Sequence, residues 1–120
     1  MNPQNESVAD LSSLTRVQLE TVRSHLAVRK GEINMQEALR TRKNNGISRG
    51  THYRIMDQAK NNIRRSLVTV AIATQLGLVN AEDVQKLISM VSKIPTDVDP
   101  DRLPEVVMLV RSLLSRIVML

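Results

Sequence analysis

Signals that begin and end α-helices recur along this chain, and no segment keeps the strict apolar–polar alternation of a β-strand. Thr15 is followed three residues later by Gln18, which is the spacing of a capping box. Asn34 and Glu37 repeat that spacing, and Asn80 precedes a further helical pattern. Glycines follow several of these patterns, at positions where helices commonly end. The sequence therefore predicts an all-α protein.

Five helices are expected, in a single domain formed by residues 1–120. A chain of this length can bury one core and is too short to suggest two domains. Residues 1–13 are polar and predict a flexible arm, residues 14–65 a first helical part and residues 66–120 a second. The expected helices run from Thr15 to Gly31, from Asn34 to Gly46, from Ser48 to Gly77, from Asn80 to Pro95 and from Pro104 to Leu120.

The longest of these helices begins after Ser48 and has one mainly apolar face. The residues of that face recur at spacings of three and four: His52, Ile55, Met56, Ala59, Ile63, Leu67 and Val70. A histidine on such a face is usually a hydrogen-bonded core residue, so His52 is expected in the core. Beyond Ser66 the helix is apolar nearly all round, which predicts that its second half is buried.

The composition excludes several classes of protein. Tyr53 is the only aromatic residue, so the core must be aliphatic, and the absence of cysteine excludes disulfides and cysteine-ligated metal sites. The apolar segments 66–79 and 106–120 are shorter than the roughly 18 apolar residues that a membrane span needs. No nucleophile–base pair, paired carboxylates, phosphate loop or metal-ligand spacing is present. We therefore expect a cytoplasmic protein that is not an enzyme and that has no cofactor or metal.

The formal net charge of +5 is concentrated in the middle of the chain. Residues 31–65 contain eight Lys or Arg and three Asp or Glu, whereas residues 66–120 contain five and six. A local excess of positive charge is typical of surfaces that bind phosphate groups, but many charge runs are only solvated helix faces. Here the excess surrounds residues 44–54, and this location favours phosphate binding.

The segment NNGISRGTHYR, residues 44–54, has the order of parts that a helix-turn-helix requires. Gly46 can adopt a left-handed conformation where a first helix ends. Ile47 can pin the turn to the core, and Ser48 can cap a second helix. The stretch GISRGTHYR resembles the recognition segment of bacterial and archaeal helix-turn-helix DNA-binding proteins, including resolvase-like domains.

This resemblance implies which residues contact DNA. By this resemblance, the residues that face DNA would be Ser48, Arg49, Gly50, Tyr53 and Arg54. The core residues would be Ile47, Ile55 and Met56. Thr51 is also a suitable residue type for contacts from the first helical turn. Phosphates would be held by Arg40, Arg42, Lys43, Lys60 and Arg64. Two positions depart from the family pattern: Arg42 replaces a small residue that packs between the helices, and His52 replaces an apolar residue.

The C-terminal helix carries eleven apolar residues between Val106 and Leu120, more than one small domain is expected to cover. Such a surface usually binds a partner, most simply a second copy of the chain, although the helix could instead be central in the core. A two-fold dimer also suits duplex DNA, because it presents paired recognition helices to two half-sites. The expected dimer contacts are Val106, Leu109, Val110, Leu113, Leu114 and Ile117.

The sequence as a whole predicts a helix-turn-helix domain with a long recognition helix and a C-terminal helical dimerisation module. The expected function is binding of double-stranded DNA as a homodimer, either as a transcriptional regulator or as an architectural, nucleoid-associated protein. The alternative is a helical protein–protein interaction module of a larger assembly, in which the basic patch is incidental. RNA binding is less favoured, because a single tyrosine cannot provide the stacking platform that single-stranded RNA requires.

Overall fold

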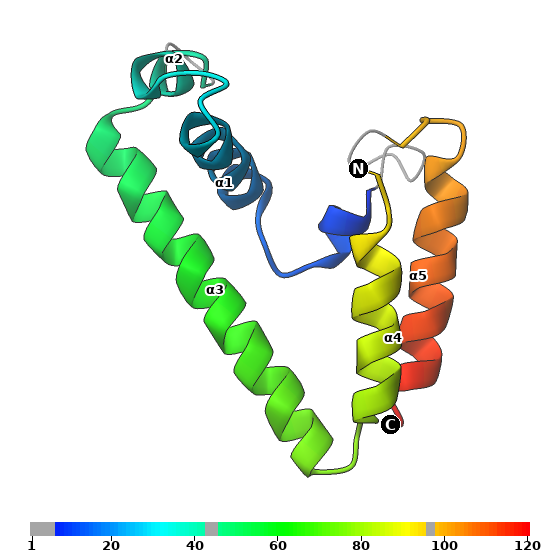
Figure 1. Cartoon of the computed structure of the whole chain (residues 1–120). Helices are drawn as coiled ribbons and strands as arrows, with labels where there is room; N and C mark the ends of the chain where they lie inside the picture. Colours follow the sequence, from blue (N-terminus) through cyan, green and yellow to red (C-terminus); the bar gives the residue numbers. More distant parts are fainter. Residues whose placement is uncertain (1–6, 43–45, 96–97) are drawn as a thin grey trace. The chain divides into compact units, whose positions relative to one another are not determined.

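The computed structural model describes residues 7–42, 46–95 and 98–120. Helices form all of the regular structure in these ranges, so the all-α prediction is confirmed (Figure 1). None of the helices in the described ranges has the length and apolar character needed to cross a membrane. The elements are a 3-10 helix, η2 (Val8–Leu11), and five α-helices: α1 (Arg16–Arg29), α2 (Met35–Arg40), α3 (Arg49–Gln75), α4 (Ala81–Ser92) and α5 (Leu103–Ile117).

The chain forms two compact units, and the division between them lies inside α3, between Arg65 and Ser66. The N-terminal unit, Ser12–Arg65, contains α1, α2 and the first part of α3. The C-terminal unit contains the rest of α3, α4 and α5, together with η2 from the start of the chain.

Side-chain caps fix the beginnings of α1, α2 and α4 where the sequence predicts them. At α1 the Thr15 hydroxyl accepts a hydrogen bond from the Gln18 N–H at 3.1 Å, and the Gln18 side chain accepts one from the Thr15 N–H at 3.2 Å. This is a complete capping box. Asn34 accepts from the Glu37 N–H, and Asn80 accepts from the Glu82 N–H, each at 2.8 Å. Each cap satisfies a backbone donor that the helix leaves unpaired.

Helix α2 ends at Arg40, six residues before the glycine that was expected to end it. The reason is a backbone hydrogen bond of 3.1 Å in which the Ile47 N–H donates to the Leu39 carbonyl. A continuing helix would offer that carbonyl to the residue four positions on, so the bond to Ile47 replaces the next helical turn. The Thr41 hydroxyl also donates to the Ala38 carbonyl, at 3.3 Å. The helix therefore has six residues.

The core of the N-terminal unit lies where the first half of α3 meets α1 and α2. Its buried apolar residues are Ala38, Ile55, Met56 and Ala59, as predicted for α3. Three polar residues are buried with them: Thr21, Arg42 and His52. The prediction that His52 is a hydrogen-bonded core residue is thus confirmed.

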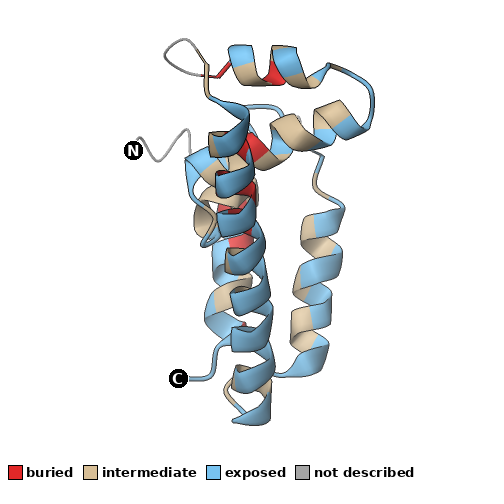
Figure 2. Ribbon diagram, turned by 90° about the vertical axis from the view of Figure 1, so that its left-hand side faces the viewer, coloured by how far each residue is buried: buried red, intermediate tan, exposed pale blue. Residues whose placement is uncertain are grey.

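The second half of α3 is exposed, so the prediction that it is buried is wrong. Leu67, Val68 and Leu76 keep 66%, 61% and 65% of their surface accessible, and Ile63 and Val70 are also exposed. Figure 2 shows this part of α3 mainly in the colour of exposed residues. In the C-terminal unit α5 packs against α4 and against η2.

In the C-terminal unit α4 and α5 lie side by side and run in opposite directions (Figure 1). Val107, Val110 and Ile117 on α5 form the buried centre. The arm expected for residues 1–13 is not loose throughout, since η2 packs against α5; residues 1–6 lie outside the described part. Helix α5 ends at Ile117 instead of Leu120, and the Met119 N–H donates to the Leu78 carbonyl at 2.8 Å.

The expected dimer contacts on α5 do not form one free surface. Val110 and Ile117 are buried within the chain itself and are unavailable to a partner, which corrects that prediction. Leu109 is exposed, whereas Val106, Leu113 and Leu114 are half-buried. The helix is therefore central in its own unit, as in the alternative considered from the sequence.

Candidate nucleic-acid interface

The turn that precedes α3 depends on Gly46. Its φ is +92°, and a Cβ added there would lie 2.6 Å from the Leu39 carbonyl oxygen. The Gly46 N–H donates to the Arg42 carbonyl at 3.0 Å, directly before the bond from Ile47 to Leu39. Both the left-handed conformation and the close approach to α2 require a residue without a side chain. The glycine thus fixes where the chain leaves α2 and where α3 begins.

Ser48 caps α3 immediately after this turn. Its hydroxyl oxygen accepts from the Thr51 N–H at 3.1 Å, and its carbonyl accepts from the His52 N–H at 3.0 Å. The Ser48 hydroxyl also donates to the Thr51 hydroxyl at 2.9 Å, and Thr51 is half-buried. Because the cap needs no intervening residue, the side chain of Arg49 already belongs to the first helical turn.

Most of the predicted DNA-contact residues are exposed on the N-terminal unit. Arg49, Gly50, Tyr53 and Arg54 are exposed in the first turns of α3. Arg40, Lys60 and Arg64 are also exposed, and Arg64 donates to the side-chain oxygen of Asn61 at 3.3 Å. Lys43 lies outside the described residues. The exposed side of α3 therefore presents basic residues over several turns, beginning at its first residue.

Arg42 is the exception, because its side chain is only 7% exposed. One guanidinium nitrogen donates to the Thr21 hydroxyl at 2.6 Å, and another lies 3.5 Å from the Val17 carbonyl. Its Nε lies 3.4 Å from a carboxylate oxygen of Glu20. A guanidinium with these partners is not available to a phosphate, so the prediction that Arg42 holds phosphate is wrong.

The surroundings of Arg42 explain how a charged residue can be buried at this position. All three partners lie on α1, and a buried charge is tolerated only when it is paired and hydrogen-bonded. The Thr21 hydroxyl in turn donates to the Val17 carbonyl at 2.7 Å. Arg42 therefore connects α1 to the chain that leaves α2, at the start of the turn before α3.

His52 lies beside Arg42 in the core and is paired with His25 of α1. The Nδ1 atom of His25 lies 3.2 Å from the Nε2 atom of His52, so one ring must donate and the other accept. Burial of His52, with the nearby positive charges of His25 and Arg42, lowers the pKa of His52 below its ordinary value of 6.5. The favoured state near neutral pH is an uncharged His52.

Tyr53 connects this pair to the exposed side of α3. Its ring meets the His52 ring edge-on, with centroids 5.2 Å apart, and the His25 ring at 6.2 Å. Tyr53 nevertheless keeps 45% of its surface accessible. Contacts with two rings restrict the orientation of the tyrosine while one side of it remains open to a ligand.

The sequence analysis did not identify Glu20, Thr21 and His25 as partners of the turn and of α3. A signal for them is present, because Val17, Thr21 and His25 follow one another at intervals of four and so share one face of α1. That face carries polar groups where an apolar stripe would be usual. The two departures from the family pattern, Arg42 and His52, are the residues that meet it.

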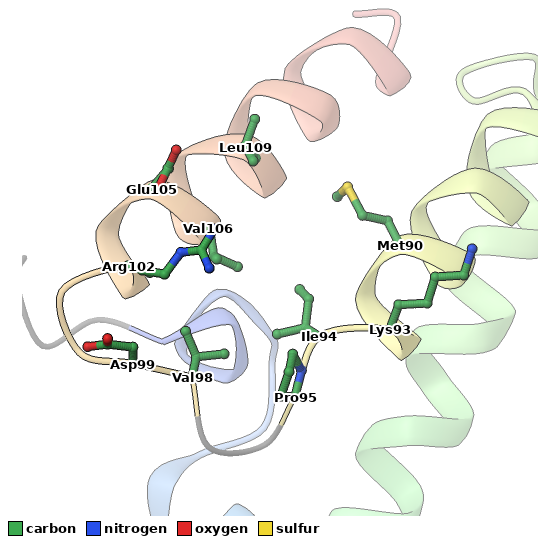
Figure 3. A pocket seen from close by; sticks show the side chains of 10 residues that line it. All are labelled: Met90, Lys93, Ile94, Pro95, Val98, Asp99, Arg102, Glu105, Val106 and Leu109. Carbon is green, nitrogen blue, oxygen red and sulfur yellow. The ribbon is translucent and has the colours of Figure 1, made fainter.

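Open hollows occur in both units. In the N-terminal unit, a hollow of about 430 Å³ is lined by polar side chains only: Gln18, Gln58, Asn61, Asn62 and Arg65. In the C-terminal unit, a mainly apolar pocket of about 490 Å³ lies between the end of α4 and the beginning of α5 (Figure 3). Lys93 and Arg102 line it together with Asp99 and Glu105, so charge selects no ligand of either sign.

Among the described residues, no three His, Cys, Asp or Glu side chains are grouped as a metal site would require. Comparison with models of protein families, with curated proteins and with solved structures finds no match to this chain.

Proposed function

We propose that this chain binds double-stranded DNA as a homodimer, with the first turns of α3 in the major groove. The observation that carries the proposal is a helix that begins directly after a turn fixed by glycine and is basic on its exposed side from its first residue. The turn and the buried side of α3 hold the helix against α1 and α2, so the exposed side is a rigid surface. A helix-turn-helix uses a rigid helix start of this kind to reach base edges.

The roles of the basic residues follow from their places on α3. Arg49, Tyr53 and Arg54 belong to the first turns and approach base edges, where arginine forms paired hydrogen bonds with guanine. Lys60 and Arg64 are exposed on later turns of α3, Arg40 is exposed at the end of α2, and these three hold phosphates. Ser48, Gly50 and Thr51 bring the backbone of the helix start close to the DNA. Lys43 remains a proposed phosphate contact. Phosphate contacts release counterions, so the affinity must fall as salt rises.

The test is fluorescence anisotropy with a random duplex of about 30 base pairs across a salt series, for the wild type and for Arg49→Ala/Arg54→Ala. We expect a steep fall of affinity with salt, and a loss of about tenfold or more in the double variant at low salt. The matched control is Arg102→Ala/Arg116→Ala, which removes the same charge from exposed residues of the C-terminal unit. An equal loss in both double variants, or no loss in the first, would contradict the proposed interface.

Binding to a random duplex does not separate a regulator from an architectural protein. A regulator binds one sequence far more tightly than random DNA, typically by 10³-fold or more. Selection of bound sequences from a random library, followed by measurement of the selected site against a scrambled one, distinguishes the two. Enrichment of a palindromic site would indicate a regulator, and an absence of enrichment despite salt-dependent binding would indicate an architectural role.

The second candidate is a protein–protein interaction module, and the exposed apolar residues in the second half of α3 favour it. In that case the basic residues of α3 are an ordinary solvated helix face. This function predicts weak DNA binding that does not respond to Arg49→Ala/Arg54→Ala. The same anisotropy experiment therefore separates the two functions.

A further inference from the structure

The exposed side of α3 changes from polar to apolar at Ser66. Gln58, Asn61, Arg65, Val68 and Ile72 follow one another at spacings of four and three, so they form one row along the helix. The first three members are polar or charged, and the last two are apolar. Both halves of the row are exposed. Contact with water is favourable for the polar first half of this row. The exposed apolar second half would be stabilised by packing against another surface.

The apolar part of α3 carries no charge at all. No Asp, Glu, Lys or Arg occurs between Arg65 and Glu82, and Leu67, Val68, Ile72 and Leu76 expose 66%, 61%, 48% and 65% of their surfaces. A solvated helix of a soluble protein normally has charged residues on its exposed side. A contiguous apolar surface bounded by charges is instead typical of a protein interface.

The charges at the two ends of this neutral segment have opposite signs. Arg64 and Arg65 precede it, and Glu82 and Asp83 follow it in the first turn of α4. Two copies packed in parallel would place basic residues against basic residues and acidic residues against acidic residues. Two copies packed antiparallel would place each basic end near the acidic end of the other. The ends are therefore complementary to a reversed second copy.

We propose that residues 66–76, the second half of α3 with Leu76 directly after it, pack antiparallel against the same segment of a second copy. This interface deepens the proposed function, since it supplies the surface of the homodimer on α3 in place of α5. The pairing has two-fold symmetry, so the same residues contact each other from both sides. Val68, Ile72 and Leu76 form the apolar contact, and the end charges fix its direction.

The first test is sedimentation equilibrium of the full chain without DNA. We expect a dimer for the wild type and a loss of about tenfold or more in dimer affinity for Ile72→Glu/Leu76→Glu, because two carboxylates would be buried in the contact. The matched control, Ile88→Glu/Met108→Glu, places the same charges at exposed apolar positions of α4 and α5 and should leave the dimer intact. Far-UV circular dichroism verifies that each variant is helical.

Three results would overturn this interface: a wild-type monomer at about 100 μM, a dimer that survives Ile72→Glu/Leu76→Glu, and equal loss of the dimer in the control. Higher oligomers that also depend on Ile72 and Leu76 would contradict the closed two-fold pairing and indicate an open, head-to-tail contact.

The second test addresses direction by exchanging charges. Arg65→Glu and Glu82→Arg should each weaken the dimer, and the double variant should restore most of the loss because the opposite signs face each other again. If the losses of dimer affinity in the two single variants simply add in the double variant, antiparallel pairing is ruled out, even if the apolar contact is correct.

Failure of this interface can be told apart from failure of DNA binding. Arg49→Ala/Arg54→Ala changes residues on the exposed side of the first turns of α3 and should leave sedimentation unchanged. A dimer that depends on Ile72 and Leu76 but does not bind DNA would retain this interface and contradict the proposed function. DNA binding by a wild-type monomer would contradict this interface and the homodimer, and would retain the DNA-binding surface of α3.

Discussion

Arg42 shows how one buried cation can organise the turn before α3. Replacing it with alanine removes three interactions with α1 and leaves the Glu20 carboxylate without its partner. We expect the free energy of unfolding to fall by about 2 kcal/mol, since hydrogen bonds to charged groups contribute roughly 1.5–3 kcal/mol each and part of that is recovered by water. Urea denaturation followed by Tyr53 fluorescence measures the change.

The control for Arg42 is Arg40→Ala, which removes the same charge two residues earlier from an exposed position. Surface substitutions of this kind usually change stability by less than about 0.5 kcal/mol. For the affinity for DNA we expect the opposite order. Arg40→Ala should weaken binding more than Arg42→Ala, because Arg40 is a proposed phosphate contact and Arg42 is buried. A folded Arg42→Ala protein with unchanged stability would mean that the contacts to α1 contribute nothing.

The histidine pair predicts a dependence of stability on pH. The pKa of His52 is lower in the folded chain than the ordinary value of 6.5, so the unfolded chain binds the proton more readily. The free energy of unfolding should therefore fall as the pH drops below about 6.5, and the loss is complete once the pH is below the folded pKa. Thermal unfolding at about pH 7.5 and about pH 5.5 measures this difference.

The comparison for this prediction is His52→Gln, whose side chain can still form a hydrogen bond with His25 but does not titrate. We expect this variant to be less stable at pH 7.5 and to lose less stability on acidification. An identical pH dependence in the wild type and the variant would assign the effect to the carboxylates of the chain instead.

At the scale of elements, the turn between α2 and α3 is specified by backbone contacts around Gly46. Alanine at this position would combine a left-handed backbone with a Cβ placed 2.6 Å from the Leu39 carbonyl oxygen. Gly31 has nearly the same φ, +78°, but nothing lies within 4 Å of an added Cβ. We expect Gly31→Ala to cost about 1–2 kcal/mol and Gly46→Ala clearly more, because only the second adds a backbone clash.

Urea denaturation of the two glycine variants gives both free energies, and anisotropy with duplex DNA gives a second comparison. Gly46→Ala should weaken DNA binding under conditions where it is still folded, since the turn sets the start of α3. Equal destabilisation by the two variants would show that the chain beside Gly46 moves easily and that the turn does not hold α3.

The helix beginnings could be predicted from the sequence, because each cap joins residues two or three positions apart. Thr15, Asn34 and Asn80 all bond to the backbone of the helix that they precede. The end of α2 could not be predicted in this way, because it depends on Ile47 donating to Leu39, eight residues earlier. Helix beginnings are thus local properties of the sequence, and this helix end is a property of the folded turn.

The difference between local and distant contacts also explains which parts of the candidate site were predicted and which were missed. The exposed basic side of α3 follows from helical periodicity, so Arg49, Tyr53 and Arg54 could be assigned to it. The burial of Arg42 depends on Thr21, which is 21 residues away, and the pairing of His52 depends on His25, which is 27 residues away. The second half of α3 was assigned to the core because an apolar segment has the same sequence whether it packs internally or against a partner.

At the scale of the whole molecule, the two units have separate buried residues, and their unfolding can be followed by separate probes. Tyr53 is the only aromatic residue of the chain and belongs to the N-terminal unit, so its fluorescence reports on that unit alone. Far-UV circular dichroism reports on the helices of both units. We expect the two urea transitions not to coincide, since separate cores unfold together only when the contacts between them are strong.

Protein concentration should shift only one of these transitions. A dimer formed through residues 66–76 stabilises the C-terminal unit by mass action, because the unfolded chain does not form the contact. Circular dichroism should therefore show a transition of the C-terminal unit that Tyr53 fluorescence does not follow. A tenfold increase in protein concentration should move this transition to higher urea and leave the Tyr53 transition in place. Coincident transitions at every concentration would mean that the continuous helix α3 couples the two units into one cooperative fold. A shift of the Tyr53 transition alone would place the dimer contact on residues 12–65, where it would compete with DNA for the same surface.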